Sequence, residues 1–445
     1  MKFFRSSAVV LASGLLLSLL PAALGGCASP TPPAAASAPA AASAPAAAPA
    51  PAAPSAPPAV AAAPRGDEAL QRRLDEVVEA ATAQGRIVGA VVVVARDGQV
   101  VYRRAAGFAD REAQRPVRED TVFRLASMTK PIVSAAALAL VDAGTLGLDD
   151  PVTKWLPSFS PRLADGRAAT ITVRHLLTHT AGLNYTFMEA PDGPYHRARV
   201  SDGLDQPGLS LEENLARIAK APLLFEPGKA WHYSLATDVL GGVVAKAGGA
   251  PLPDVVRRLV TGPLGMDAAF AVADPGRLAV PYGDAGARPA RMADPQVVSF
   301  GPAKITYSPS RILDPRSYPS GGAGMVGTAD DYLKFLEAVR TGGGKILRPA
   351  TVQAMTSNQT GDLEVQQPGG KWGFGFGFAV LKAPEPGTMP SAAGTWQWGG
   401  AYGSNFWVDP SAKLTVIVLT NTALAGMAGE FPDAVRRAVY GQAQP

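Results

Sequence analysis

The sequence contains very little cysteine and very little histidine. Among 445 residues there is one cysteine, Cys27, and there are four histidines. One cysteine excludes an intramolecular disulfide, and its position near the N-terminus excludes a thiol nucleophile inside a folded domain. With so few histidines and no cysteine to join them, a metal site is poorly supported, and we expect no metal and no cofactor. The sequence therefore points towards an oxygen nucleophile.

Charge is also scarce. The formal net charge is +4, and it becomes +2 if Lys2 and Arg5 are removed with a leader that holds no acidic residue. No basic tract interleaved with aromatic residues is present, so we expect no nucleic-acid partner. A hydrophobic share of 47% with 18% charged residues is typical of a globular enzyme, and the length allows one large domain or two interleaved lobes.

The first 65 residues are predicted to form a signal peptide for export and a tether. Residues 1–26 have a basic start followed by an apolar run, which predicts a signal peptide. Their ending, Leu24-Gly25-Gly26-Cys27, resembles a bacterial lipoprotein signal, which implies lipid on Cys27 and a membrane-tethered protein facing the periplasm. Ordinary signal cleavage nearby is the alternative. Residues 27–65 are mainly Ala and Pro and predict an extended, disordered tether.

Folded sequence is predicted for residues 66–445. A helical apolar pattern covers 70–81, and Asp97-Gly98 predicts the turn of a hairpin between 87–95 and 99–104. Residues 128–264 look mainly helical, with Ser210 and Glu213 expected to form a capping box. Strand patterns return near 372–378, 395–398, 404–408 and 414–421, before a last helix at 432–440. We expect an α/β (α+β) fold: an antiparallel sheet lobe from about 66–126 and 300–445, flanked by helices, and a mainly helical lobe from about 127–299.

One Ser-x-x-Lys occurs, Ser127-Met128-Thr129-Lys130, between a strand-like segment and a helix-like one. Ser127 at a helix N-terminus would have Lys130 one turn later on the same face. A serine hydroxyl needs such a base, and burial together with the helix dipole favours a neutral lysine. The alternative is a helix capped by Ser127 with Lys130 in solvent.

Tyr233, after a Pro227-Gly228 turn, is a second candidate because a phenol near a lysine can relay a proton, although alone it could be a core tyrosine. His175 and His179 are spaced like a zinc pair but lack the glutamate that should follow, so we interpret them as structural. His232, beside Tyr233, is a possible neighbour of the site.

Five segments, taken in their order along the chain, resemble the motifs of class C β-lactamase-like proteins of the serine β-lactamase and penicillin-binding-protein superfamily. They are residues 123–130, 175–183, 233–241, 321–325, and 398–400 with 406–410. The resemblance implies the serine β-lactamase/transpeptidase-like fold, Ser127 as acyl-accepting nucleophile, Lys130 as its base and Tyr233 as proton relay. It also implies an oxyanion hole formed by the N–H groups of Ser127 and Ala401.

Two departures from the family pattern concern the substrate. Leu235 stands where β-lactamases usually have the asparagine of Tyr-x-Asn, and Trp398-Gly399-Gly400 replaces Lys-Thr-Gly on the edge strand. The missing lysine would hold a substrate carboxylate. Both changes resemble family VIII carboxylesterases, so Leu235, Trp398, Gly399 and Gly400 are predicted substrate-binding residues.

The leading hypothesis is a serine carboxylesterase acting on small or medium acyl esters. A β-lactamase, a D-amino-acid peptidase or carboxypeptidase, and a linear-amide hydrolase are the alternatives with the same nucleophile. A non-catalytic peptidoglycan-binding protein is the alternative of another class. A small-molecule ester or amide and the membrane are the expected partners, and no protein partner is predicted.

Overall fold

The computed structural model describes residues 67–283 and 288–442. The predicted signal peptide 1–26, Cys27 and the tether 27–65 lie outside the described residues. Within the described ranges, no single helix is both long and apolar enough to cross a membrane, and one bent pair, Ala236–Gly248 with Leu252–Thr261, would qualify by length and composition only.

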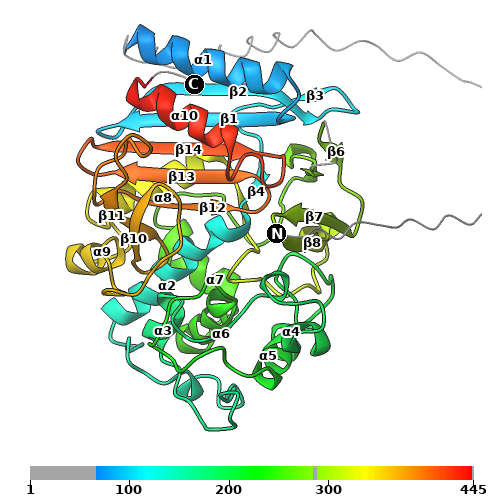
Figure 1. Cartoon of the computed structure of the whole chain (residues 1–445), viewed down its shortest axis with the longest axis vertical. Coiled ribbons are helices and arrows are strands. Elements are labelled where there is room, and N and C mark those ends of the chain that lie inside the picture. The colour runs from blue at the N-terminus through cyan, green and yellow to red at the C-terminus, as the bar shows by residue number, and fades with distance from the viewer. Residues whose placement is uncertain (1–66, 284–287, 443–445) are drawn as a thin grey trace, which may run out of the picture. The chain divides into compact units, whose positions relative to one another are not determined.

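The centre of the fold is an eight-stranded antiparallel sheet in the order β10-β11-β12-β13-β14-β1-β2-β3 (Figure 1). Strand β1 pairs with β2 on one side and with β14 on the other, so the two ends of the described chain meet in the middle of the sheet. The predicted fold class is confirmed. The strands are β1 (Gly89–Arg96), β2 (Gln99–Asp110), β3 (Arg115–Pro116), β10 (Gly370–Phe374), β11 (Ala379–Pro384), β12 (Trp396–Gly400), β13 (Ser404–Asp409) and β14 (Leu414–Thr420).

Local sequence explains the first hairpin. Asp97 and Gly98 both have positive φ, 50° and 80°, which a two-residue turn of the primed type requires. Side chains then alternate between the two faces of the sheet, because successive Cβ atoms of a strand point to opposite sides. Val92 and Val418 face one hydrophobic core, and Val91 and Ile417 face the other.

Helices cover both faces. α1 (Glu68–Ala83) and α10 (Glu430–Tyr440) pack side by side on the face of Val92 (Figure 1). α8 (Ala329–Arg340) packs against β14 and β1 on the opposite face. Thr328 caps α8 in a full capping box with Asp331.

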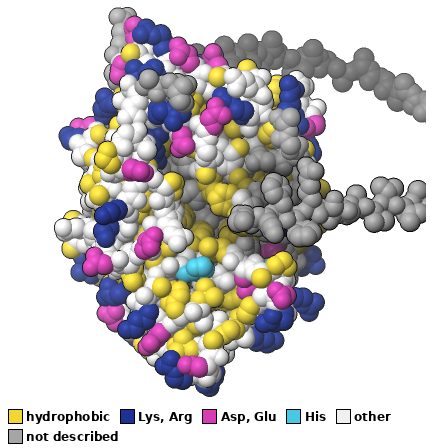
Figure 2. Space-filling model, in the orientation of Figure 1, with side chains coloured by type: hydrophobic (Ala, Val, Ile, Leu, Met, Phe, Trp, Pro, Cys, Tyr) yellow, Lys and Arg dark blue, Asp and Glu magenta, His cyan; other side chains and the backbone are white. Residues whose placement is uncertain are grey.

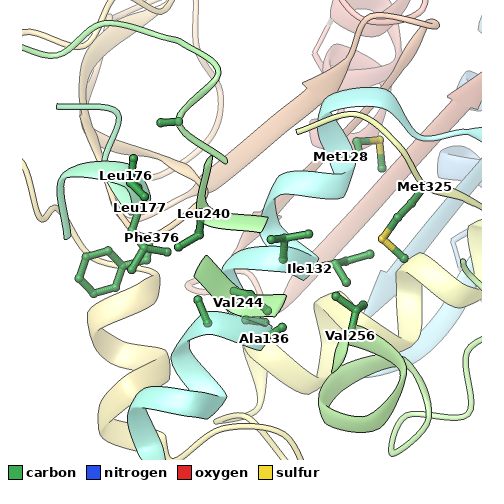
Figure 3. Close-up of a cluster of buried hydrophobic side chains, with 14 of the residues drawn as sticks. Met128, Ile132, Ala136, Leu176, Leu177, Leu240, Val244, Val256, Met325 and Phe376 are labelled. Carbon is green, nitrogen blue, oxygen red and sulfur yellow. The ribbon is translucent and has the colours of Figure 1, made fainter. Parts of the chain in front are cut away.

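α2 (Thr129–Asp142) forms the middle of the helical half, and nearly all its residues are buried. Ile132 and Ala136 on α2 pack against Leu240 and Val244 on α6 (Ala236–Gly248), with Phe376 in the same cluster (Figure 3). This packing fixes the start of α2 relative to the start of α6. The other helices are α3 (Val173–Leu177), α4 (Pro194–Arg197), α5 (Leu211–Lys220), α7 (Leu252–Val256) and α9 (Pro349–Met355).

Two details differ from the expectations. The middle of the chain contains a hairpin, β7 (Gln296–Phe300) with β8 (Ala303–Tyr307), in addition to helices. The box at α5 is only half formed, because Ser210 accepts from the Glu213 N–H while the Glu213 carboxylate pairs with Arg217. Smaller pairs are β4 (Phe123–Arg124) with β9 (Val326–Gly327) and β5 (Tyr282–Gly283) with β6 (Ala290–Arg291).

Candidate active site

Ser127 lies in a 3₁₀ turn, Ala126–Met128, that leads directly into α2. Ala126 has a left-handed backbone, φ 44°, which a residue with a Cβ adopts only when its surroundings enforce it. The Ser127 side chain is half-buried and makes no capping bond to the helix. The alternative arrangement, with Ser127 as a helix cap, is therefore not formed.

Lys130 is 1% exposed, and its Nζ lies 3.1 Å from Ser127 Oγ. The same nitrogen donates to the carbonyl of Gly322 at 2.8 Å. It also lies 4.8 Å from the centre of the Tyr233 ring and 5.5 Å from that of Tyr185. Lys130 is thus a desolvated amine held next to the hydroxyl, not a solvated side chain.

Tyr233 completes a three-residue contact around the serine. Its hydroxyl donates to Ser127 Oγ at 2.7 Å. Tyr233 comes shortly before α6 and is half-buried, with its ring against core residues. Because α2 and α6 pack together, residues 106 positions apart in sequence meet at one oxygen atom.

A buried carboxylate, Asp238 on α6, lies behind this group. A Cβ placed on Gly322 would lie 2.3 Å from Asp238 Oδ2 and 3.4 Å from Lys130 Nζ, so the carboxylate and the amine flank Gly322. Asp238 Oδ1 accepts from Ser320 at 2.6 Å, and burial raises the pKa of Asp238. Sequence reasoning missed this residue, although an acidic residue within an apolar helical run is a detectable signal.

The end of β12 approaches the backbone that precedes Ser127. A Cβ on Gly400 would lie 2.2 Å from the carbonyl oxygen of Leu125, so only glycine fits there. Ala401 follows at once, and its carbonyl accepts from Tyr307 Oη at 3.0 Å and from the Leu424 N–H at 3.2 Å. We call the meeting of residues 125–127 with residues 400–401 the backbone junction. Tyr307, on β8, was missed from the sequence.

Aromatic side chains gather around Tyr233, the ring whose hydroxyl contacts Ser127, and we call this set the aromatic cluster. The Trp398 ring centre lies 5.1 Å from that of Tyr233 and 5.3 Å from that of Phe374. Apolar side chains gather between the sheet and the helices on the face shown in Figure 2. The cluster consists of Tyr185, Trp231, Tyr233, Phe374 and Trp398.

His179 backs the aromatic cluster and is 1% exposed. Its Nδ1 accepts from the Ser234 N–H at 3.3 Å, and its ring lies 4.9 Å from that of Tyr233. Burial first, and then the positive charge of Lys130, hold the pKa of His179 well below its ordinary value. A neutral His179 thus positions the residues around Tyr233. His175, predicted to be structural, accepts from the Thr172 N–H in the capping box of α3.

The remaining predicted positions differ in their surroundings. Gly399 lies beside Met427, whose Cγ would be 2.8 Å from a Cβ at that position. Leu235 is fully buried in the main core, which leaves its predicted contact with substrate without support. His232 bonds through Nε2 to Asn184 Oδ1 at 2.8 Å. Among the described residues, no cluster of three or more His, Cys, Asp or Glu side chains could hold a metal ion.

Comparison with known proteins gives consistent matches. The family model described as Beta-lactamase matches residues 74–439. The chain is 51% identical over 378 residues to Esterase EstB of Burkholderia gladioli, covering 84% of this chain and 95% of that one. A solved structure, EstCE1, a hydrolase with promiscuous acyltransferase activity, superposes with a TM-score of 0.80 at 46% identity, covering 84% and 99% of the two chains. A penicillin-binding-protein homologue from Caulobacter crescentus, 24% identical, has the same fold with a TM-score of 0.61, covering 86% and 98%.

Proposed function

The chain belongs to the β-lactamase family, and we propose that it is a carboxylesterase of this family that forms an acyl-enzyme at Ser127. The observation that carries the proposal is the position of Ser127 Oγ between Lys130 Nζ at 3.1 Å and Tyr233 Oη at 2.7 Å. The similarity to esterases at 51% and 46% identity supports ester rather than amide substrates.

Acylation begins when Ser127 Oγ attacks the ester carbonyl carbon and its proton passes to Lys130 Nζ, which acts as the base. The carbonyl oxygen becomes an oxyanion, and the N–H groups of Ser127 and Ala401 at the backbone junction donate to it. The bond to the leaving alkoxide then breaks. Tyr233 gives that alkoxide its proton and regains one from the Lys130 ammonium.

Deacylation runs through the same groups. Water attacks the acyl carbon, its proton passes to the Tyr233–Lys130 pair, and Ser127 leaves as an alcohol after taking a proton back. Asp238, on the other side of Gly322 from Lys130, lies near the proton that Lys130 holds between these steps.

The surroundings of Ser127 favour neutral substrates. Trp398 occupies the position where a lysine would hold a substrate carboxylate, and it packs on Tyr233 and Phe374. An aromatic surface binds an uncharged acyl or alcohol group and supplies no partner for a carboxylate. We therefore propose small or medium acyl esters as substrates.

The test compares p-nitrophenyl butyrate with nitrocefin for the native enzyme and for Ser127→Ala. We expect ester turnover that Ser127→Ala abolishes, together with little nitrocefin cleavage. Dominant nitrocefin cleavage would make the protein a β-lactamase. No turnover of either compound, and no covalent adduct with a fluorophosphonate, would favour the binding-protein alternative.

Acyl transfer is a second candidate activity, favoured by the activity attributed to EstCE1. An alcohol that binds the aromatic cluster can replace water as the acceptor of the acyl group. When p-nitrophenyl butyrate is incubated with the enzyme and an added alcohol, we expect the butyrate ester of that alcohol among the products. Gas chromatography detects it. Hydrolysis alone at high alcohol concentration would reject this activity.

We also propose that the enzyme is exported and tethered through lipid on Cys27, as its signal sequence predicts. Cells grown with a clickable palmitate analogue should label the native protein but not Cys27→Ser. Equal labelling of the two proteins, or none, would instead indicate ordinary signal cleavage.

A further inference from the structure

The aromatic cluster contains two phenols, Tyr233 and Tyr185, and the proposed mechanism does not use Tyr185. It is 3% exposed, and its ring centre lies 5.1 Å from that of Tyr233. The ring also lies 5.5 Å from Lys130 Nζ. Tyr185 therefore faces both groups that exchange protons with Ser127.

The backbone around Tyr185 is fixed by buried bonds. The Asn184 N–H donates to Tyr195 Oη at 3.0 Å. The N–H groups of Thr186 and Phe187 donate to the buried Asp202 carboxylate, at 2.8 and 3.3 Å. The Tyr185 ring also stacks on Phe187, with ring centres 4.7 Å apart. These contacts hold the phenol in one place, as a preorganised donor requires.

The chemical state of Tyr185 also fits a donor. Burial raises the pKa of Tyr185 well above its ordinary range, and the negative charges that Tyr233, Asp238 and Asp202 can carry add to this effect. A phenol that keeps its proton can donate to Tyr233 Oη while the Tyr233 hydroxyl donates to Ser127 Oγ.

We propose that Tyr185 is a positioning residue for proton relay: its hydroxyl donates to Tyr233 Oη and stabilises the phenolate that Tyr233 becomes when it protonates the leaving alcohol. In that step the carbon–oxygen bond to the alkoxide breaks, and the proton of Tyr233 moves to the alkoxide oxygen. The negative charge then rests on Tyr233 Oη until the Lys130 ammonium returns a proton. Tyr185 keeps its own proton throughout. This inference rests on the proposed esterase function.

The proposal predicts that the effect of Tyr185→Phe on kcat/KM depends on the leaving group of the ester. An ethoxide must be protonated as it leaves, whereas p-nitrophenolate leaves as a stable anion. The experiment measures kcat/KM, which reports acylation, for ethyl butyrate and p-nitrophenyl butyrate with the native enzyme and Tyr185→Phe. We expect a loss of about tenfold or more for the ethyl ester, the order expected for a donor to a developing charge, and less than about threefold for the nitrophenyl ester.

Tyr195→Phe is the matched control, because it removes a hydroxyl that holds the same segment without facing Tyr233. A purely structural role for the segment would make both variants lose activity equally on the two esters. That result for Tyr185→Phe would overturn the inference and leave the proposed esterase intact. No ester turnover by the native enzyme would overturn both.

A series of aryl butyrates provides a readout that does not depend on how much of Tyr185→Phe is folded. The logarithm of kcat/KM is plotted against the pKa of the leaving phenol. We expect a steeper slope for the variant than for the native enzyme, since the less acidic phenols need the relay more. Identical slopes would overturn the inference.

Discussion

Two groups of atoms near Ser127 differ in kind: one consists of main-chain atoms and the other of aromatic side chains. The backbone junction consists of main-chain atoms, with Gly400 so close to Leu125 that a Cβ would lie 2.2 Å from its carbonyl oxygen. The aromatic cluster consists of rings whose centres lie 5.1 to 5.6 Å apart and which belong to separate segments. Main-chain donors act on any carbonyl in the same way, whereas side chains distinguish substrates. Under the proposed function, the first group therefore acts on every ester alike, whereas Trp398 and the rings packed on it select among esters.

The largest expected effect comes from removing Lys130, the proposed base of Ser127. In Lys130→Ala, Ser127 loses its base, and acylation should fall by on the order of 10²- to 10⁴-fold for every substrate. Labelling by a fluorophosphonate measures acylation, and circular dichroism checks that the variant is folded. Normal labelling would contradict the role assigned to Lys130.

Changing the backbone junction should affect all substrates equally. In Gly400→Ala, the new Cβ forces β12 away from Leu125, and a shift of this kind costs on the order of 10²-fold in kcat. Gly399→Ala is the milder comparison, because its Cβ would lie 2.8 Å from Met427 Cγ and 3.1 Å from the Ser404 carbonyl oxygen, farther than the 2.2 Å at Gly400. Equal activity of the two variants would show that the close approach does not matter.

Changing the aromatic cluster should alter selectivity. Trp398→Lys removes the ring packed on Tyr233 and Phe374, and kcat/KM for p-nitrophenyl butyrate should fall by about tenfold. The new cation should at the same time raise the relative rate for nitrocefin, which carries a carboxylate. An unchanged ratio of the two rates would mean that Trp398 does not select against anions.

Tyr307→Phe changes the backbone junction less than Gly400→Ala does. It removes the hydroxyl that donates to the Ala401 carbonyl, and kcat should fall by about threefold to tenfold, the value of one hydrogen bond, with KM little changed. Tyr402→Phe, whose ring lies 5.0 Å from that of Tyr307, is the control. If the two variants behave alike, the Ala401 peptide is held by other contacts.

The last prediction concerns the pH dependence of stability and not a rate. His179 is buried and its pKa is lowered in the folded state, so the unfolded chain binds its proton first as the pH falls below about 6.5. The free energy of unfolding is therefore unaffected by this titration above that pH. It falls on acidification, by up to about 1.4 kcal/mol per pH unit. The difference in unfolding free energy between the native protein and His179→Asn, measured from pH 7.5 to 5, should narrow accordingly. A constant difference would mean that His179 titrates alike in both states.

Most of the architecture was predictable because its signals are local. The Asp97-Gly98 turn and the terminal strands and helices follow from spacing and turn chemistry within a few residues. The predicted family is confirmed by the match over residues 74–439, and the predicted hydrolase class by the esterases among its relatives. The hairpin β7–β8 was missed because its residues are partly exposed and show weak alternation.

The site was predictable only in part. Ser127 and Lys130 stand on one helical turn, so their proximity follows from sequence spacing. Leu235 was assigned from its place in a motif, yet the packing of α6 turns its side chain into the core. Tyr185 and Tyr307 lie in no matching segment, and Asp238 lies in one that assigned it no role. The contacts of these three residues join segments between 48 and 94 residues apart.

By itself, the sequence determined which reactive groups this protein has: one Ser-x-x-Lys pair, a tyrosine in a matching motif, and a tryptophan in place of a lysine. These follow from covalent order and from short-range periodicity. Only the tertiary structure decided that Tyr233 reaches Ser127 Oγ, that Gly400 meets Leu125, and that a buried carboxylate stands behind Lys130. Those contacts depend on how α2, α6 and β12 pack, and packing is set by the simultaneous fit of many distant side chains.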